Sequence, residues 1–180
     1  MITKRVFLGL CFVSVVLLPF TQGLTQTQPT PGAKAPIITQ SYAVEKGRYG
    51  DVVKFFIEAT DPDADMFRIA AVVDQVGYGR HPTSWIYLKP QHKDHFVGYV
   101  EWSTYSSKSI RIRDWTQLTI RISVFDSRGK ESPVATFPFV FMSEALFHPP
   151  PPAPFDQANV QRLGMMDVDL VEPSAPLFPD

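Results

Sequence analysis

The chain has 180 residues, 44% of them hydrophobic, and its 17 basic side chains nearly balance its 18 acidic ones. A protein with this balance lacks the excess positive charge that tracks a phosphate backbone, so we expect no nucleic-acid partner. The single cysteine, Cys11, lies near the N-terminus, so a domain further along must be held together by its hydrophobic core and not by disulfides.

The N-terminus has the pattern of a secretory signal peptide. Two basic residues precede an apolar run over residues 6–20, and Thr21 and Gly23 are small residues at the two positions that a signal peptidase reads. The run is shorter than the roughly 20 residues of a membrane-spanning helix. We therefore expect residues 1–23 to be removed, which leaves no membrane span and places the mature protein in the periplasm or outside the cell.

The rest of the chain predicts one all-β domain between irregular ends. Residues 24–34 have the composition of a linker. Over residues 35–147 apolar segments alternate with turn residues, and no long segment has helical periodicity. Seven segments have the character of strands: Ile37–Val44, Val52–Ala59, Phe67–Val73, Ser84–Leu88, Phe96–Thr104, Gln117–Phe125 and Val134–Phe141. This number and spacing predict a seven-stranded immunoglobulin-like β-sandwich.

Alternating apolar residues indicate which face of each strand is buried. The expected core faces are Val53, Phe55, Ile57 and Ala59; Phe67, Ile69, Ala71 and Val73; Phe96, Val100 and Trp102; and Leu118, Ile120, Ile122 and Val124. Pro138 lacks the N–H that a sheet ladder needs, so we expect the last strand at a sheet edge.

Residues 148–180 predict a proline-rich and mostly irregular C-terminal tail. The prolines after His148 favour a stiff, extended polyproline II segment. Residues 156–166 could form a short helix, because Val160, Leu163 and Met166 would then fall near one face. The tail is more apolar than a solvating tail needs, so we expect it to project as a docking arm that contacts a partner through Phe155, Leu163 and Met166.

Two stretches of the domain carry a family resemblance. Ala35-Pro36, Tyr42-Ala43-Val44-Glu45, Gly47, the run Val52–Ala59 and Thr60-Asp61-Pro62-Asp63 resemble the opening of a cadherin-type repeat. Val124-Phe125-Asp126, followed by Gly129 and Ser132, is similar to the penultimate strand of that family and its exit turn. Bacterial immunoglobulin-like repeats share these marks over residues 35–141. The resemblance implies the same extracytoplasmic sandwich fold.

The same resemblance implies a weak calcium site, the one cofactor we consider. It places the ligands at Asp61, Asp63 and Asp126, with Asp65 as a neighbour that could replace one of them. Calcium takes six to eight hard oxygen ligands, which clustered carboxylates can supply. The alternative is that the aspartates form hydrogen-bonded turns, which Asp, Pro and Gly favour at strand ends.

Aromatic residues between the third and sixth expected strands are candidate contact residues. Trp85, Tyr87 and Tyr99 could meet a protein partner or a sugar, since Trp and Tyr supply large, rigid contact area. Tyr87 and Tyr99 are the expected exposed pair. Trp102 is in register with the core, and Trp115 is expected to plug one end of the sandwich.

The pattern as a whole favours a non-catalytic binding or scaffold module whose partner is a protein of the cell envelope or extracellular space. A carbohydrate-binding module that uses exposed Trp and Tyr is the alternative. A small secreted hydrolase is the alternative from a different functional class, but no combination of nucleophile, base and orienting group can be identified in the sequence. His92 and His95 are expected in a solvated loop, without a third ligand for zinc.

Overall fold

The computed structural model describes residues 32, 34–109, 112–144, 148–158 and 160–172. The signal peptide expected over residues 1–23 lies outside these ranges, so its removal stays a prediction. Within these ranges, no helix is long and apolar enough to cross a membrane.

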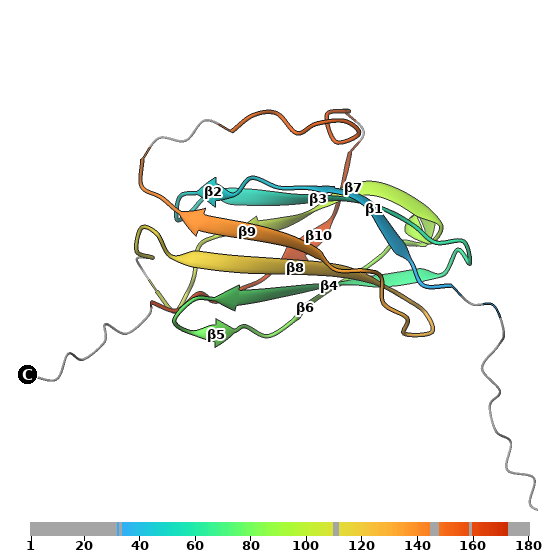
Figure 1. The fold of residues 1–180 in the computed structure, drawn as a ribbon, viewed down its shortest axis with the longest axis horizontal. Coiled ribbons are helices and arrows are strands. Elements are labelled where there is room, and N and C mark those ends of the chain that lie inside the picture. Colours follow the sequence, from blue (N-terminus) through green and yellow to red (C-terminus); the bar gives the residue numbers. More distant parts are fainter. Residues whose placement is uncertain (1–31, 33, 110–111, 145–147, 159, 173–180) are drawn as a thin grey trace, which may run out of the picture. The chain divides into compact units, whose positions relative to one another are not determined.

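The described part of the chain folds into two facing β-sheets (Figure 1). Sheet A has the order β1 (Ile37–Tyr42), β3 (Val52–Thr60), β7 (His95–Ser103) and β10 (Gln161–Met166). Sheet B has the order β2 (Lys46–Gly47), β9 (Ala135–Phe141), β8 (Gln117–Asp126), β4 (Met66–Gln75) and β5 (Gly79–Arg80), and β6 (Ser84–Tyr87) also pairs with β4. A short 3₁₀ helix, η1 (Pro90–His92), precedes β7. The all-β immunoglobulin-like class is confirmed, and all seven expected strands are present.

The core lies between the two sheets and is built from the predicted faces. In β3 and β8 every expected core residue is buried, and Trp102 of β7 has an exposed fraction of 0%. Trp102 packs edge-to-face on Phe139, with ring centroids 5.6 Å apart. Pro138 lies on β9, which is not the expected edge strand because β2 pairs on its outer side. In the described ranges β2 pairs only with Val140 and Phe141, so Pro138 itself has no strand partner on that side.

Two expectations about the core are wrong. Phe67 is exposed by 44%, and Met66 is buried in its place at 1%. The register of β4 against β8 shifts between Met66 and Arg68, so a β-bulge turns the side chain of Phe67 outward. Trp115 does not plug the sandwich: it is 67% exposed and has a positive φ of 68°.

The C-terminal segment is part of the fold, which corrects the expected helix and docking arm. Residues 161–166 form β10, which pairs in parallel with β7 at the edge of sheet A. Five apolar side chains of this segment are buried to 8% exposure or less: Phe155, Leu163, Met166, Val168 and Leu170. The sandwich therefore continues past residue 147. Of the three side chains expected to contact a partner, Leu163 and Met166 join the core, and Phe155 is buried against Phe56 on the outer face of sheet A.

Polar contacts fasten the chain after β10 to sheet B and its loops. The buried side-chain amide of Gln75 donates to the backbone oxygen of Val171 and accepts from its nitrogen at 3.3 Å. Ser106 Oγ donates to the oxygen of Leu170 at 2.6 Å. Ser84 Oγ donates to the oxygen of Asp167 at 2.9 Å. The segment thus starts on sheet A and ends against sheet B.

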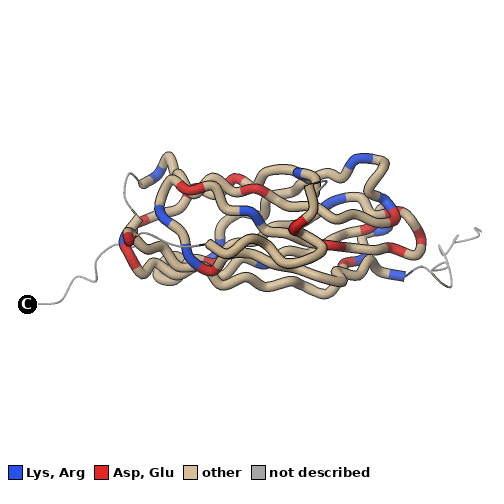
Figure 2. Tube along the Cα trace, turned by 90° about the horizontal axis from the view of Figure 1, so that it is seen from above, with Lys and Arg blue, Asp and Glu red and all other residues tan. Residues whose placement is uncertain are grey.

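The proline-rich residues between β9 and β10 arch over the β3 side of sheet A before the chain returns as β10 (Figure 1). Basic and acidic residues are interspersed along the domain (Figure 2). Charge therefore acts locally in this protein, through individual charged side chains beside individual surfaces.

Candidate binding sites

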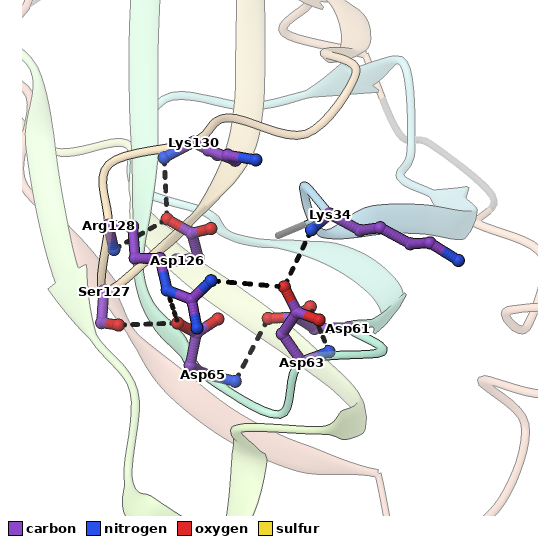
Figure 3. Close-up of polar contacts among 8 residues, drawn as sticks. All are labelled: Lys34, Asp61, Asp63, Asp65, Asp126, Ser127, Arg128 and Lys130. Carbon is purple, nitrogen blue, oxygen red and sulfur yellow. Dashed lines mark hydrogen bonds and ion pairs between the residues drawn. The ribbon is translucent and has the colours of Figure 1, made fainter. Parts of the chain in front are cut away.

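The four aspartates expected to bind calcium do lie together, at the end of the sandwich where β3 and β8 finish (Figure 3). Asp61 is buried and closes its own turn. Its Oδ1 accepts a hydrogen bond from the nitrogen of Asp63 at 3.0 Å, and its Oδ2 accepts one from the nitrogen of Asp65 at 3.2 Å. Burial raises the pKa of the Asp61 carboxyl above 3.8, the Asp63 and Asp65 backbone donors lower it, and the Asp65 carboxylate raises it again.

Asp126 organises the second turn in the same manner. It is 2% exposed, and its Oδ1 accepts hydrogen bonds from the nitrogens of Arg128 at 2.9 Å and Lys130 at 2.7 Å. Carboxylates that accept backbone N–H bonds satisfy donors that would otherwise be buried without a partner. Asp61 and Asp126 are therefore structural residues of their turns.

Arg128 joins the two turns, because its guanidinium group pairs with both Asp63 and Asp65. The guanidinium of Arg128 lies over both, with Nε 3.4 Å from Asp65 Oδ2 and Nη1 3.8 Å from Asp63 Oδ2 (Figure 3). Ser127 Oγ donates to Asp65 Oδ2 at 2.8 Å, and the nitrogen of Lys34 donates to Asp63 Oδ2 at 2.8 Å. Arg128 thus gives these two carboxylates a positively charged partner within the chain.

Within the described ranges, no group of three or more His, Cys, Asp or Glu side chains has the arrangement to hold a metal ion. Asp65 Oδ1 and Asp126 Oδ2 are buried without a hydrogen-bond partner in these ranges. We infer that the aspartates shape and join the turns, and the calcium site implied by the resemblance stays untested.

An exposed group of aromatic residues lies on the outer face of sheet B. Trp85 and Tyr87 on β6 are 43% and 60% exposed, because Ile86 between them points into the core. Phe67 lies edge-to-face with Tyr87 at a centroid distance of 5.3 Å. The guanidinium of Arg68 lies 4.0 Å from the ring centroid of Trp85. We call Trp85, Tyr87, Phe67 and Arg68 the aromatic patch.

Tyr99, the expected companion of Tyr87, lies on the other sheet. It is half-buried on the outer face of sheet A, where it is the cross-strand partner of Phe56, and Phe56 is in turn the partner of Tyr42. Phe155 packs on the middle ring of this row, with its ring centroid 5.5 Å from that of Phe56. Tyr87 and Tyr99 therefore do not form one surface. The sequence missed Phe67 and Arg68 because the bulge in β4 gives no composition signal.

The histidines form no group that could do chemistry together in the described ranges. His81 is buried and its Nε2 lies 2.9 Å from Gln75 Oε1, while His95 Nε2 lies 3.1 Å from Glu58 Oε1. His92 is also buried, against Phe96, so the expected solvated loop is wrong for this residue. Burial lowers the pKa of His81 and of His92 below 6.5, and Lys108 and Lys89 respectively lower them further.

No protein-family model and no curated protein matches this chain. Among solved structures it is similar to the PKD domain of an M14-like peptidase from a Thermoplasmatales archaeon, at 20% identity and a TM-score of 0.39 over 61% of this chain and 97% of that one. It is also similar to the CARDB domain of the PF1109 protein from Pyrococcus furiosus, solved with di-metal ions, at 9% identity and a TM-score of 0.32 over 59% of this chain and 87% of that one. Both are immunoglobulin-like β-sandwich domains. Likeness at this level concerns the fold class, and the sites rest on the geometry above.

Proposed function

We propose that this protein is a non-catalytic, extracytoplasmic binding module that holds a protein partner through the aromatic patch. The observation that carries the proposal is the combination of Trp85, Tyr87 and Arg68 on one exposed sheet face. Trp, Tyr and Arg are the residue types most enriched among interface hot spots.

The geometry of the patch suits recognition because its side chains are held in place before binding. The guanidinium of Arg68 lies over the adjoining rings of Trp85 and Phe125, 4.0 Å from the centroid of Trp85 and 5.6 Å from that of Phe125. Tyr87 is held edge-on by Phe67. A contact group that is already ordered loses less conformational entropy on binding, so more of its interaction energy remains as affinity.

A carbohydrate ligand is the second candidate, and one observation favours it. Trp85 and Tyr87 stand two residues apart on β6 and point to the same side. Their exposed rings could lie against the apolar faces of successive sugars. This candidate shares the patch with the first, so the same variants test both.

The test compares the mature protein with the double variant Trp85→Ser/Tyr87→Ser in cross-linking to native envelope proteins and in binding to a glycan array. Tyr105→Ser is the matched control, since Tyr105 is 63% exposed but lies in the loop after β7. We expect the double variant to lose a specific cross-linked protein that the control retains, with stability changed by about 1 kcal/mol or less. Array binding without a protein cross-link would favour the sugar; equal cross-linking by all three proteins would contradict the patch.

A further inference from the structure

A second surface, on the opposite side of the sandwich, contains a hollow. The outer face of sheet A and the arch of residues 148–155 border an open groove with a volume of about 620 Å³. Ligand sites for small molecules have volumes of about 300–1,000 Å³. We call this space the arch groove. From its lining and its charges we propose that it binds a small organic anion whose planar, apolar body lies on the aromatic row Tyr42, Phe56 and Tyr99.

The floor of the arch groove is apolar and aromatic, because three neighbouring strands each contribute one ring at the same level. Tyr42 of β1, Phe56 of β3 and Tyr99 of β7 are consecutive cross-strand partners. Ring centroids are 6.2 Å apart for Tyr42 and Phe56 and 5.5 Å apart for Phe56 and Tyr99. All three are half-buried, so part of each ring is available to a body that stacks on them.

The proline-rich arch forms the roof of the groove. Residues 149–152 are all prolines, and the lack of a backbone N–H in proline keeps this stretch from pairing with sheet A. Residues 153–156 form a turn that contains Phe155. The arch is held at two points: the hydroxyl of Tyr42 donates to the oxygen of Pro149 at 3.5 Å, and Phe155, 3% exposed, packs on Phe56. Between these points Pro151 faces the hollow. The space is therefore a property of the fold.

The charges along the groove select the sign of the ligand. Lys46, Arg48 and Lys54 line it, against the single carboxylate Asp51. Asp51 is engaged by Arg48, whose backbone nitrogen donates to Asp51 Oδ2 at 2.8 Å and whose Nε lies 3.8 Å from it.

The two lysines keep their charge available. Glu101 is the cross-strand partner of Lys54, but its Oε2 is bound by Arg162 Nε at 2.9 Å. Lys54 Nζ lies instead 4.6 Å from the ring centroid of Tyr99, directly beside the aromatic row. Within the described ranges no ion pair engages Lys46 or Lys54. A ligand that brings an aromatic body to the row and a carboxylate or sulfonate to the lysines would satisfy both features at once.

The test uses three probes of the same shape and different charge: indole-3-acetate, the neutral indole-3-acetamide and the cation tryptamine. Each is titrated into the full mature protein, and binding is followed by the shifts of backbone amide signals in nuclear magnetic resonance spectra. We expect indole-3-acetate to bind at least about tenfold more tightly than the other two. The shifts should centre on Phe56, Tyr99 and Phe155.

The lysines are tested by Lys46→Gln/Lys54→Gln, which should weaken indole-3-acetate about tenfold and abolish the preference for the anion. The matched control is Lys89→Gln/Lys93→Gln, which removes the same charge beside η1, away from the groove. Equal affinity for all three probes, equal loss in both variants, or shifts centred elsewhere would overturn the proposal. So would a concentration-dependent dimer whose interface covers Phe56 and Tyr99, since a second copy would then be the occupant.

Discussion

Substitution of Gly98 by alanine should destabilise the domain by pushing β10 away from β7. Gly98 is buried on β7, opposite Gln161. A Cβ atom there would lie 2.6 Å from Leu163 Cγ and 2.7 Å from the backbone oxygen of Gln161. Carbon atoms pack at about 3.5–4.0 Å, and the backbone of β10 cannot rotate away as a side chain can. Strand β10 must therefore shift.

Overpacking of this kind costs about 1–3 kcal/mol. In a domain near 150 residues each kcal/mol lowers the melting temperature by about 2–4 °C, so we expect a loss of roughly 2–12 °C for Gly98→Ala. Circular dichroism gives the melting temperature, and hydrogen exchange should show the largest loss of protection in residues 161–166. Ser103→Ala, at an exposed position of the same strand, is the control and should melt like the wild type. A Gly98→Ala protein that melts within 1 °C of the wild type would refute the packing of β10 on β7.

Three other predictions concern the turns and the buried histidines. Asp126→Ala should cost about 2–4 kcal/mol, measured by urea unfolding, because two backbone donors lose their charged acceptor. The melting temperature of the protein should be the same in about 5 mM calcium and in chelator, since Arg128 already pairs with Asp63 and Asp65. A rise of the melting temperature in calcium that Asp63→Asn removes would establish the calcium site instead. Stability should decrease as pH falls below 6.5, because the lowered pKa values of His81 and His92 mean that the unfolded chain binds more protons there; a flat profile between pH 7 and about pH 5 would contradict their burial.

Long strands with one buried face were predictable from the sequence because each satisfies the same local rule. Val53, Phe55 and Ile57 alternate with exposed or half-buried residues, and the structure buries all three. Phe67 breaks the rule because a bulge inserts a residue, and no property of the local sequence marks where a ladder shifts.

The C-terminal strand resembles a helix in its sequence for a related reason. Its register shifts between Arg162 and Gly164, so Leu163 and Met166 both face the core three residues apart. A spacing of three imitates one face of a helix. Its partner, β7, is some sixty positions earlier in the chain, and long-range pairing leaves no local signal.

The candidate binding sites also divide into features that a local sequence pattern predicts and features that depend on distant parts of the chain meeting. The sequence could predict that Trp85 and Tyr87 are exposed, since both flank Ile86, the inward-facing residue of a short strand. It could not predict the arch groove, because the groove needs the cross-strand register of three strands and the return of the proline segment over them. The turn contacts of Arg128 likewise depend on two loops that meet only in the folded protein.

The central claim is that the chain from Phe155 to Leu170 completes the sandwich, and a truncated protein ending at residue 147 tests it most directly. Five buried apolar side chains would be lost, each contributing about 1.5–3 kcal/mol, and their sum of roughly 8–15 kcal/mol rivals the whole stability of a domain. We expect no cooperative thermal transition for this protein, partial recovery when a peptide of residues 155–172 is added, and a wild-type transition for a control ending at residue 172. A protein ending at residue 147 that melts cooperatively within a degree or two of the full chain would contradict the account.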